Sequence, residues 1–438
     1  MAGDFMRRPT ARSTRLLGGL IVAKICCMAG SAAFASTLVE LARLWHLDAA
    51  HAGWISSAYF IGYTIAVPVL VGLTDVIDAR FIYLAGCAIG ALAFAGFARY
   101  ADGLWSAFVF QMMAGVSLAA VYMPGLRILT QRLTGRARIR AVPYYTSAFG
   151  IGTALSYLIS GWTAASYGWR ASFMAAALAS VIAAIVMLLA TRGIAVEPGF
   201  EVRLSERHPL DFRPALKSRG ALAYIFAYGG HCWELFAFRT WLPAFLTFAW
   251  TRTRAIGAGL AIARWSMLIT LIGVPSSIVG AELAHRWTRD RLLRWFECAS
   301  VVIAISGAAG GNLSFGFAVA AMFVYNTAIT ADSGALTAGT VAITRPEEQG
   351  ATLAVYSLVG FGGGAIGPLA VGSVLDLGGG FNAGRAWYAG FAAMAIGSLL
   401  AAISISLLPA RLREKSAFSE TLAKAGPLQP TTASRNPE

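Results

Sequence analysis

The chain has few charged residues for its length. Of its 438 residues, 13% are Asp, Glu, Lys or Arg, whereas 57% are hydrophobic. Soluble domains carry about 25% charged residues, so this composition excludes an ordinary water-soluble protein and favours one folded in lipid. The net charge of +14 arises from basic residues scattered in short groups between apolar runs. This distribution argues against a phosphate-binding face, so no nucleic-acid partner is expected.

Motifs of metal, cofactor and nucleophile chemistry are also missing. The sequence contains no Gly-x4-Gly-Lys-Ser/Thr phosphate loop, no His-Glu-x-x-His zinc motif and no Gly-x-Ser-x-Gly elbow. An ATP-driven pump within this single chain is therefore excluded, and neither an enzyme nor a bound cofactor or metal is expected. The five cysteines all lie in or at the ends of apolar segments, so no disulfide framework is expected.

What the sequence does contain is a series of long apolar runs. A helix needs about 20 mostly apolar residues to cross the hydrocarbon core of a bilayer. About twelve runs satisfy this requirement: 16–38, 52–73, 81–98, 104–128, 141–163, 171–190, 221–248, 256–280, 292–309, 313–343, 350–375 and 387–408. We therefore predict an all-α polytopic membrane protein with twelve transmembrane helices.

The distribution of Lys and Arg predicts the orientation of these helices. With the N-terminus in the cytoplasm, the cytoplasmic segments hold 25 Lys and Arg residues and the outer loops hold six. The positive-inside rule then predicts that both termini are cytoplasmic, in a multi-pass protein of the inner membrane.

A repeated motif divides the chain into two halves. Tyr-x4-Phe-Gly-x-Gly occurs at 144–152 and again at 356–364, an offset of 212 residues. We predict a cytoplasmic N-terminus (1–15), an N-terminal six-helix bundle (16–191), a central cytoplasmic loop (192–220), a C-terminal six-helix bundle (221–408) and a cytoplasmic tail (409–438).

Two loops carry a recognisable signature. "VGLTDVIDARFIY" resembles the loop motif Gly-x-Leu-x-Asp-Arg-x-Gly-Arg-Arg of the major facilitator superfamily through Leu73, Asp75 and Arg80. "GAELAHRWTRDR" resembles a second, degenerate copy through Leu283, Arg286 and Arg289. The resemblance implies two pseudo-symmetric six-helix bundles. It also implies a gating role for Asp75 and Arg80, with Arg286 and Arg289 in the second copy.

Seven residues with charged or readily charged side chains are expected at bilayer depth, where a charge costs at least about 2.5–3.5 kcal/mol. They are Lys24, Arg127, His231, Glu234, Arg239, Arg264 and Asp332. The resemblance implies that helices 1, 4, 7 and 10 line a central cavity, and six of the seven lie on those helices. We therefore expect a polar cavity bordered by His231, Glu234 and Arg239.

Proton coupling is expected to involve Glu234. Burial disfavours the charged form of a carboxyl group, so Glu234 is the first candidate proton carrier, His231 a relay and Asp332 a second protonation site. The alternative is a permanently ionised Glu234 paired with Lys24 or Arg239.

Substrate binding is expected to involve Arg239 and Arg264, with Lys24 assisting and Phe238 and Trp241 as aromatic walls. Two guanidinium groups suit a carboxylate or another planar anion. The alternatives are that Arg239 pairs with Glu234 or reaches the membrane interface, and that Lys24 neutralises an acid across the cavity.

Glycines in the fifth and eleventh helices are candidate hinges. They are Gly150, Gly152, Gly362 and Gly364, with Pro368. These residues allow helices to approach closely and to bend, as sliding between two halves would require, although tight packing alone explains them too.

Together these features predict a secondary active transporter that works by alternating access. The expected partners are a small-molecule substrate, protons and the lipid bilayer, and the chain is expected to function as a monomer. We expect a proton-coupled carrier of a small organic or inorganic anion. The alternatives are a proton-antiport exporter of drugs or metabolites and a non-transporting membrane sensor.

Overall fold

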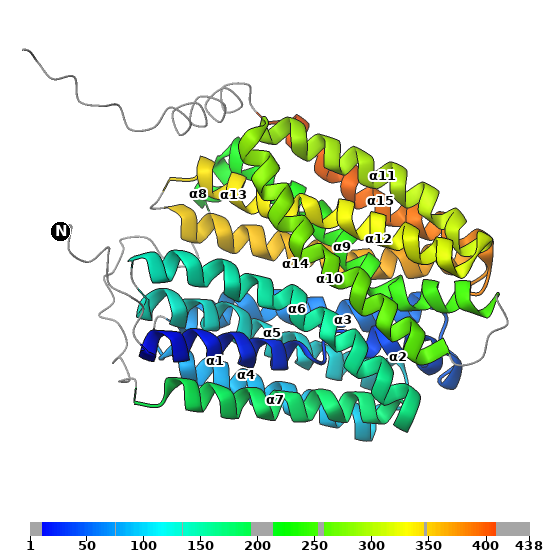
Figure 1. The fold of residues 1–438 in the computed structure, drawn as a ribbon, viewed down its shortest axis with the longest axis horizontal. Helices are drawn as coiled ribbons and strands as arrows, with labels where there is room; N and C mark the ends of the chain where they lie inside the picture. Colours follow the sequence, from blue (N-terminus) through cyan, green and yellow to red (C-terminus); the bar gives the residue numbers. More distant parts are fainter. Residues whose placement is uncertain are drawn as a thin grey trace, which may run out of the picture.

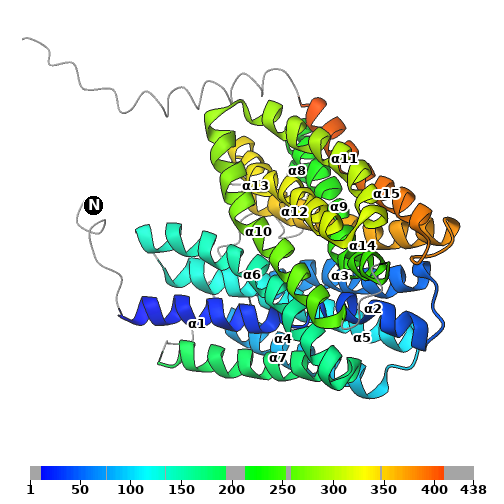
Figure 2. The same cartoon turned by 45° about the vertical axis from the view of Figure 1, so that its right-hand side comes forward.

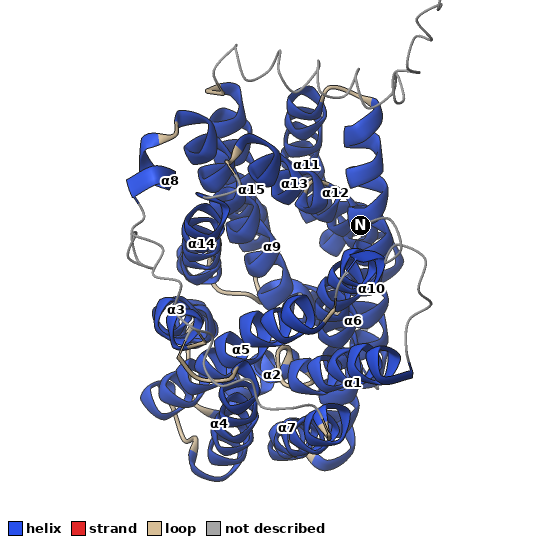
Figure 3. Ribbon diagram, turned by 90° about the vertical axis from the view of Figure 1, so that its left-hand side faces the viewer, coloured by secondary structure: helices blue, strands red, loops and turns tan. Residues whose placement is uncertain are grey.

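The computed structural model describes residues 11–74, 76–133, 135–193, 213–252, 258–345 and 348–408. Within these ranges the chain is almost entirely helical and contains no strand (Figure 3). Asp75, most of the predicted segments 1–15 and 192–220, and the whole of the predicted tail 409–438 lie outside the described residues.

The helices form two groups that lie side by side (Figure 1). The N-terminal bundle comprises α1 (Ala11–Met28), α2 (Ala33–Leu44), α3 (Ala49–Leu73), α4 (Ala79–Tyr100), α5 (Leu104–Arg132), α6 (Gly135–Tyr167) and α7 (Trp169–Thr191). The C-terminal bundle comprises α8 (Arg213–Lys217), α9 (Arg219–Thr251), α10 (Ala258–Arg286), α11 (Arg289–Leu313), α12 (Phe315–Ala331), α13 (Ser333–Ile343), α14 (Gln349–Leu377) and α15 (Gly384–Ser406).

The predicted number of crossings agrees with this arrangement. Ten helical segments in the described ranges are long and apolar enough to span a membrane, with α1–α2 and α12–α13 each counted as one interrupted segment. The long helices α6 and α9 complete the twelve. The all-helical, twelve-segment fold that the sequence predicts is confirmed.

Two of the predicted spans are interrupted rather than continuous. The first breaks between Met28 and Ala33, where Gly30 lies against the ring of Phe94 so closely that a Cβ atom would be 2.2 Å from it. Ser156 of α6 satisfies the backbone there, because its hydroxyl donates to the carbonyl of Ala29 (2.6 Å) and accepts from the N–H of Ala32 (2.9 Å). The predicted run 313–343 breaks at Asp332, between α12 and α13.

The two bundles meet along two long helix pairs, α3 with α14 and α6 with α10, and the short helix α2 also contacts α9. We call the end of the molecule where α1 begins and α15 ends the terminus face, and the end that carries the α2–α3 and α14–α15 connections the opposite face. Figure 2 shows α10 leaning away from α6 toward the terminus face.

The opposite face is closed by contacts between the bundles. The carboxylate of Asp376, near the end of α14, accepts hydrogen bonds from the backbone N–H groups of Ala49 (2.8 Å) and Ala50 (2.7 Å), which begin α3. An anion at a helix N-terminus is stabilised by the helix dipole as well as by these bonds. The backbones approach so closely here that a Cβ atom on Gly53 would lie 2.7 Å from the carbonyl oxygen of Pro368.

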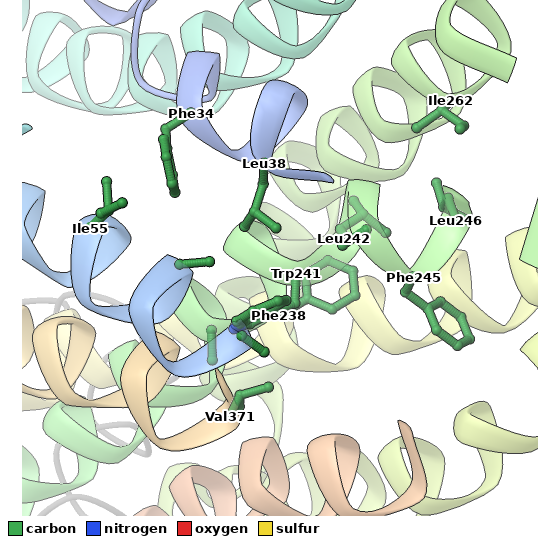
Figure 4. Packing of buried hydrophobic residues seen from close by; sticks show 14 of the residues in the cluster. Phe34, Leu38, Ile55, Phe238, Trp241, Leu242, Phe245, Leu246, Ile262 and Val371 are labelled. Carbon is green, nitrogen blue, oxygen red and sulfur yellow. The ribbon is translucent and has the colours of Figure 1, made fainter. Parts of the chain in front are cut away.

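A hydrophobic cluster that includes both bundles lies behind this closure (Figure 4). Phe34 and Leu38 of α2 face Trp241 and Leu242 of α9, and Val371 of α14 lies nearby. Nearer the middle of the helices, Tyr63 of α3 stacks on Phe361 of α14 with ring centroids 3.7 Å apart. These contacts all lie at mid-helix or toward the opposite face.

We predict that Asp376→Asn opens the opposite face. Asparagine keeps one acceptor oxygen but loses the charge at the α3 N-terminus, worth about 1 kcal/mol, so the open population should rise about fivefold. A single cysteine at Ser56, placed in a variant without the five native cysteines, would report this as faster labelling by an impermeant thiol reagent added from that side.

Asp48→Asn is the matched control. Asp48 caps the same helix from within its own bundle, since its side chain accepts from the N–H of His51 (2.7 Å). Equal labelling rates in the two variants would show that Asp376 does not hold the face closed.

Candidate functional site

A cavity lies between the bundles and is lined by both of them. Its walls come from the α1–α2 segment, α3, α5, α6 and α9. The lining residues are Met28, Ser31, Phe34, Ala35, Ser56, Tyr59, Phe60, Gln111, Phe149, Thr153, Tyr157, Phe236, Arg239 and Thr240. The lining is mainly aromatic and hydroxyl-bearing, with one charged side chain.

That charged side chain is Arg239 of α9. Its guanidinium carbon lies 5.8 Å from the ring centroid of Phe149 and 5.9 Å from that of Phe236. The buried Nε has no hydrogen-bond partner, and the described part of the chain offers Arg239 no salt bridge. The Tyr157 hydroxyl donates to the backbone carbonyl of Arg239 and fixes this turn of α9 against α6. Arg239 is therefore a cation held in an aromatic chamber without a protein counter-ion.

The other ionisable residues of α9 lie elsewhere, which corrects the expectation that His231, Glu234 and Arg239 border one cavity. His231 and Glu234 are 2% and 1% exposed and point into the C-terminal bundle. The reason is that α9 is buried on nearly every side, so its successive faces meet different neighbours.

The two predicted aromatic walls also lie in the C-terminal bundle. Phe238 packs edge-on against Tyr325, with ring centroids 5.2 Å apart. The Trp241 indole N–H donates to the carbonyl of Pro368 (3.0 Å), so Trp241 belongs to the cluster of Figure 4. The aromatic walls of the cavity are instead Phe60, Phe149 and Phe236, with Tyr59. Arg264 is exposed on α10 and does not line the cavity.

Lys24 lies inside the N-terminal bundle, behind the cavity wall. The residue is 1% exposed. Its ammonium group donates to the carbonyl of Tyr145 (2.9 Å) and lies 4.0 Å from the ring centroids of both Tyr122 and Tyr145. Cation–π contact and one carbonyl replace the acid partner that the sequence suggested. The ring of Phe149 is near both Lys24 and Arg239, since each cation lies 5.8 Å from its ring centroid.

Glu234 is held by hydroxyl groups. Its Oε1 accepts from Ser300 of α11 (3.0 Å) and from Tyr325 of α12 (2.7 Å), and its Oε2 accepts from Ser398 of α15. Neither Lys24 nor Arg239 pairs with it. Three neutral hydroxyl donors therefore take the place of the ion pair with Lys24 or Arg239 that the sequence offered as an alternative.

His231 contacts the break between α12 and α13. Its Nδ1 lies 2.8 and 3.0 Å from the two carboxyl oxygens of Asp332, and its Nε2 lies 3.0 Å from the Ser333 hydroxyl. Glu297 of α11 completes this group, because its side chain lies within hydrogen-bonding reach of that of Asp332. Sequence reasoning missed Glu297. The available signal was an acid inside the predicted span 292–309, flanked by Phe296 and Cys298.

The loop between α3 and α4 is anchored by Asp78 and Arg80 at the terminus face. Asp78 caps α4 and accepts from the Arg80 side chain in a bidentate pair (2.7–3.1 Å), and Arg132 approaches to 3.7 Å. Asp75 is outside the described residues. In the second loop, Arg286 forms an exposed pair with Glu282 (3.0 Å), and Arg289 is buried at the start of α11.

The candidate hinge glycines make different contacts. A Cβ atom on Gly150 would lie 2.8 Å from Val274 of α10, and one on Gly364 would lie 2.4 Å from Phe236, whereas Gly362 has open space. Gly152 faces Met28 within its own bundle. Gly150 and Pro368 therefore lie on the interface between the bundles.

The comparisons with known proteins decide the family. The model of the Major Facilitator Superfamily matches residues 20–342. The chain belongs to the major facilitator superfamily. It is therefore a membrane transporter of small molecules and not an enzyme, as the sequence predicted.

Two characterised members of this superfamily are similar in sequence. The niacin transporter NiaP of Acinetobacter baylyi is 23% identical over 299 residues, which cover 61% of this chain and 66% of that protein. The multidrug transporter protein MdtP of Bacillus subtilis is 21% identical over 140 residues, 32% of this chain and 26% of that protein. The matched region thus spans less than two thirds of either relative.

Solved structures of the superfamily share the fold. A bacterial homologue of the human lysosomal transporter Spinster, in an inward-facing and unoccupied conformation, superposes with a TM-score of 0.74 at 15% identity, over 94% of this chain and 98% of that one. A D-xylose-proton symporter gives 0.72 at 12% identity, over 90% and 98%. At these identities the likeness concerns the fold alone.

We predict that Asp78 stabilises the loop in a pH-dependent way. Burial raises the pKa of its carboxyl, but the hydrogen bonds and charge of Arg80, with the charge of Arg132, outweigh this and hold the pKa below its usual range. A lowered folded-state pKa means that the stabilisation is present above the unfolded value, about 3.9, and is lost as the pH falls through the folded value.

Asp78→Asn should therefore lower the melting temperature in detergent at pH 7, and the difference from wild type should shrink below about pH 4. Glu282→Gln removes the analogous exposed pair and should change little, because exposed ion pairs contribute about 0–1 kcal/mol. A constant Asp78→Asn deficit from pH 7 to pH 3 would contradict this account.

Proposed function

We propose that this transporter carries a small organic anion that contains a planar ring and a carboxylate. The observation that carries the proposal is Arg239, an unpaired guanidinium in a cavity between the bundles. A guanidinium presents two parallel N–H groups to a carboxylate, and the phenyl rings of Phe149, Phe236 and Phe60 offer faces for a ring to stack on.

The similarity to a niacin transporter supports this substrate class. Niacin is a pyridine ring that carries one carboxylate, and it therefore presents the two features that the lining would recognise. The match covers 66% of that relative at 23% identity, so it supports a related class of substrate and does not identify niacin as the substrate.

We infer that the substrate is released by a rocking movement of the two bundles. The bundles contact each other at mid-helix and at the opposite face, where Asp376 caps α3, and α10 leans away from α6 toward the terminus face. Gly150 and Pro368 lie on the interface where such a movement requires close helix contact. With both termini in the cytoplasm, this conformation is closed to the outside of the inner membrane.

Transport is coupled to protons in this proposal. Asp332 is buried in the C-terminal bundle, and within the described part of the chain His231 is the only basic residue that contacts it. Groups in such surroundings exchange protons during functional cycles. His231 lies on α9 together with Arg239, so a change of charge on this helix reaches the substrate site.

Export of drugs is the second candidate function, because the multidrug relative matches part of the chain. An aromatic cavity would suit apolar drugs. A cationic drug would meet the unpaired charge of Arg239, which disfavours it by like-charge repulsion. Export of cationic dyes from cells that express the protein, with no uptake of niacin or benzoate, would favour this second function.

We predict that Arg239→Gln weakens the binding of radiolabelled niacin roughly 10- to 100-fold, the equivalent of one lost charge-assisted contact of about 1.5–3 kcal/mol. Arg239→Lys keeps the charge but not the paired N–H geometry and should recover only part of the affinity. Equilibrium binding and uptake into proteoliposomes under a pH gradient measure both variants.

Arg264→Gln is the matched control, because Arg264 is exposed on the neighbouring helix α10. Its affinity should stay within about twofold of wild type. If Arg239→Gln binds niacin and benzoate as wild type does, or if wild type binds neither, the anion proposal is wrong.

A further inference from the structure

The proton site proposed above can be located among the buried acids of the C-terminal bundle. Glu297 of α11 and Asp332 at the α12–α13 break are 3% and 2% exposed, and their carboxyl groups lie within hydrogen-bonding reach of each other. Each leaves one oxygen, Oε1 of Glu297 and Oδ1 of Asp332, without a donor. A hydrogen bond between two carboxyl groups requires a proton on one of them, since two carboxylates have no donor. In an apolar bundle, two ionised carboxylates at this distance would also repel strongly.

The partners of each group indicate which one carries the proton. Asp332 faces Nδ1 of His231 at 2.8 and 3.0 Å, so it has a second donor and is the better anion. Glu297 has no such second donor, and its Oε1, like the Oδ1 of Asp332, is buried without a hydrogen-bond donor. A buried carboxylate without a donor would be an uncompensated charge, so the acid that lacks the histidine contact is the one that stays neutral. Glu297 is therefore the protonated member of the pair.

Glu234 has the opposite arrangement. Three hydroxyl groups, of Ser300, Tyr325 and Ser398, donate to its two oxygens. A carboxylate accepts several such bonds at once, whereas a protonated carboxyl would present its own hydrogen to one of these donors. This set of donors stabilises an ionised Glu234 and leaves no reason for it to take up a proton.

His231 connects the acid pair to a more accessible group. Its Nδ1 faces Asp332, and its Nε2 lies 3.0 Å from the hydroxyl of Ser333, which is partly exposed at the start of α13. A neutral imidazole can accept a proton at Nε2 and release one from Nδ1, so one proton enters from the Ser333 side and one passes to Asp332. When the ring has returned to its first tautomer, it has gained one proton and released one, so its charge is unchanged.

We propose that the Glu297–Asp332 pair is the proton-binding site of the transporter, that His231 relays protons between this pair and Ser333, and that Glu234 is a fixed anion. This inference rests on the proposed proton coupling and names the groups that perform it. Glu297, the residue that carries the proton, lies on α11, which is not one of the four cavity-lining helices expected from the sequence.

The charged and titratable groups around the pair come from every helix that packs on it. These are His231, Glu234 and, one step further along α9, Arg239; Tyr325 on α12; and Arg294 and Cys298 on α11 itself, where Arg294 pairs with Asp290. The helix α15 contributes the Ser398 hydroxyl. Among these described neighbours His231 is the only basic group in direct contact, so no permanent cation removes the need for a shared proton.

The test compares Glu297→Gln with Glu234→Gln in proteoliposomes, with radiolabelled niacin as the probe. A glutamine amide can donate to Asp332 as a protonated carboxyl does, so Glu297→Gln should fold and mimic the protonated state. We expect it to retain niacin exchange across the membrane but to lose accumulation driven by a pH gradient.

Binding of niacin gives a second measurement. In wild type, the affinity should fall as the pH rises through the titration of the pair, by at most about tenfold per pH unit for one linked proton. In Glu297→Gln this pH dependence should disappear. In Glu234→Gln the protein should be less stable, yet the folded fraction should retain the proton-to-niacin ratio and the pH dependence of wild type.

The outcomes separate this inference from the proposed function. If wild type transports niacin with proton coupling and Glu297→Gln remains coupled, or if Glu234→Gln alone is uncoupled, the proton site is not the Glu297–Asp332 pair, although the proposed function stands. If wild type transports niacin without any proton coupling, the proposed coupling itself fails.

Discussion

The cost of placing charge inside a helix bundle surrounded by lipid determines how this protein is built. Each buried ionisable group has its own solution. Lys24 lies between two tyrosine rings, Glu234 accepts from three hydroxyl groups, and Asp332 is bonded to His231 and Glu297. Arg239 alone among the intramembrane cations turns toward the cavity without a counter-ion. The structure thus separates charges that stabilise the bundles from the charge that is free to meet a ligand.

The sequence was sufficient for the fold because membrane helices are defined by length and hydrophobicity, which are local properties. It was insufficient for the site because the direction of a side chain depends on neighbouring helices. On α9, the angles between His231, Glu234 and Arg239 follow from about 100° per residue, but the helix is enclosed and each angle meets a different partner. The prediction that Phe238 and Trp241 line the cavity used the same helix angles, without knowledge of the neighbouring helices. Glu297 was missed because it lies near the start of the predicted run 292–309, close to the basic residues of the preceding loop.

The helix interruptions illustrate a second limit of sequence reasoning. Neither break contains proline, and the runs 16–38 and 313–343 read as continuous apolar helices. The first break exists because Gly30 must fit against Phe94 and because Ser156 can bond the released backbone groups. The second places Asp332 beside His231. Both depend on residues more than 50 positions away, so no local pattern could have revealed them.

Phe149 is near two cations, since its ring centroid lies 5.8 Å from Lys24 and 5.8 Å from Arg239. Two like charges in a medium of low dielectric constant repel each other. Within the described residues neither cation pairs with an acid, and the electron-rich faces of the surrounding aromatic rings compensate them only in part. The cavity therefore has a positive electrostatic potential, to which Lys24 contributes from behind its wall. An arriving anion would relieve repulsion already present in the protein, and part of its binding energy would come from that relief.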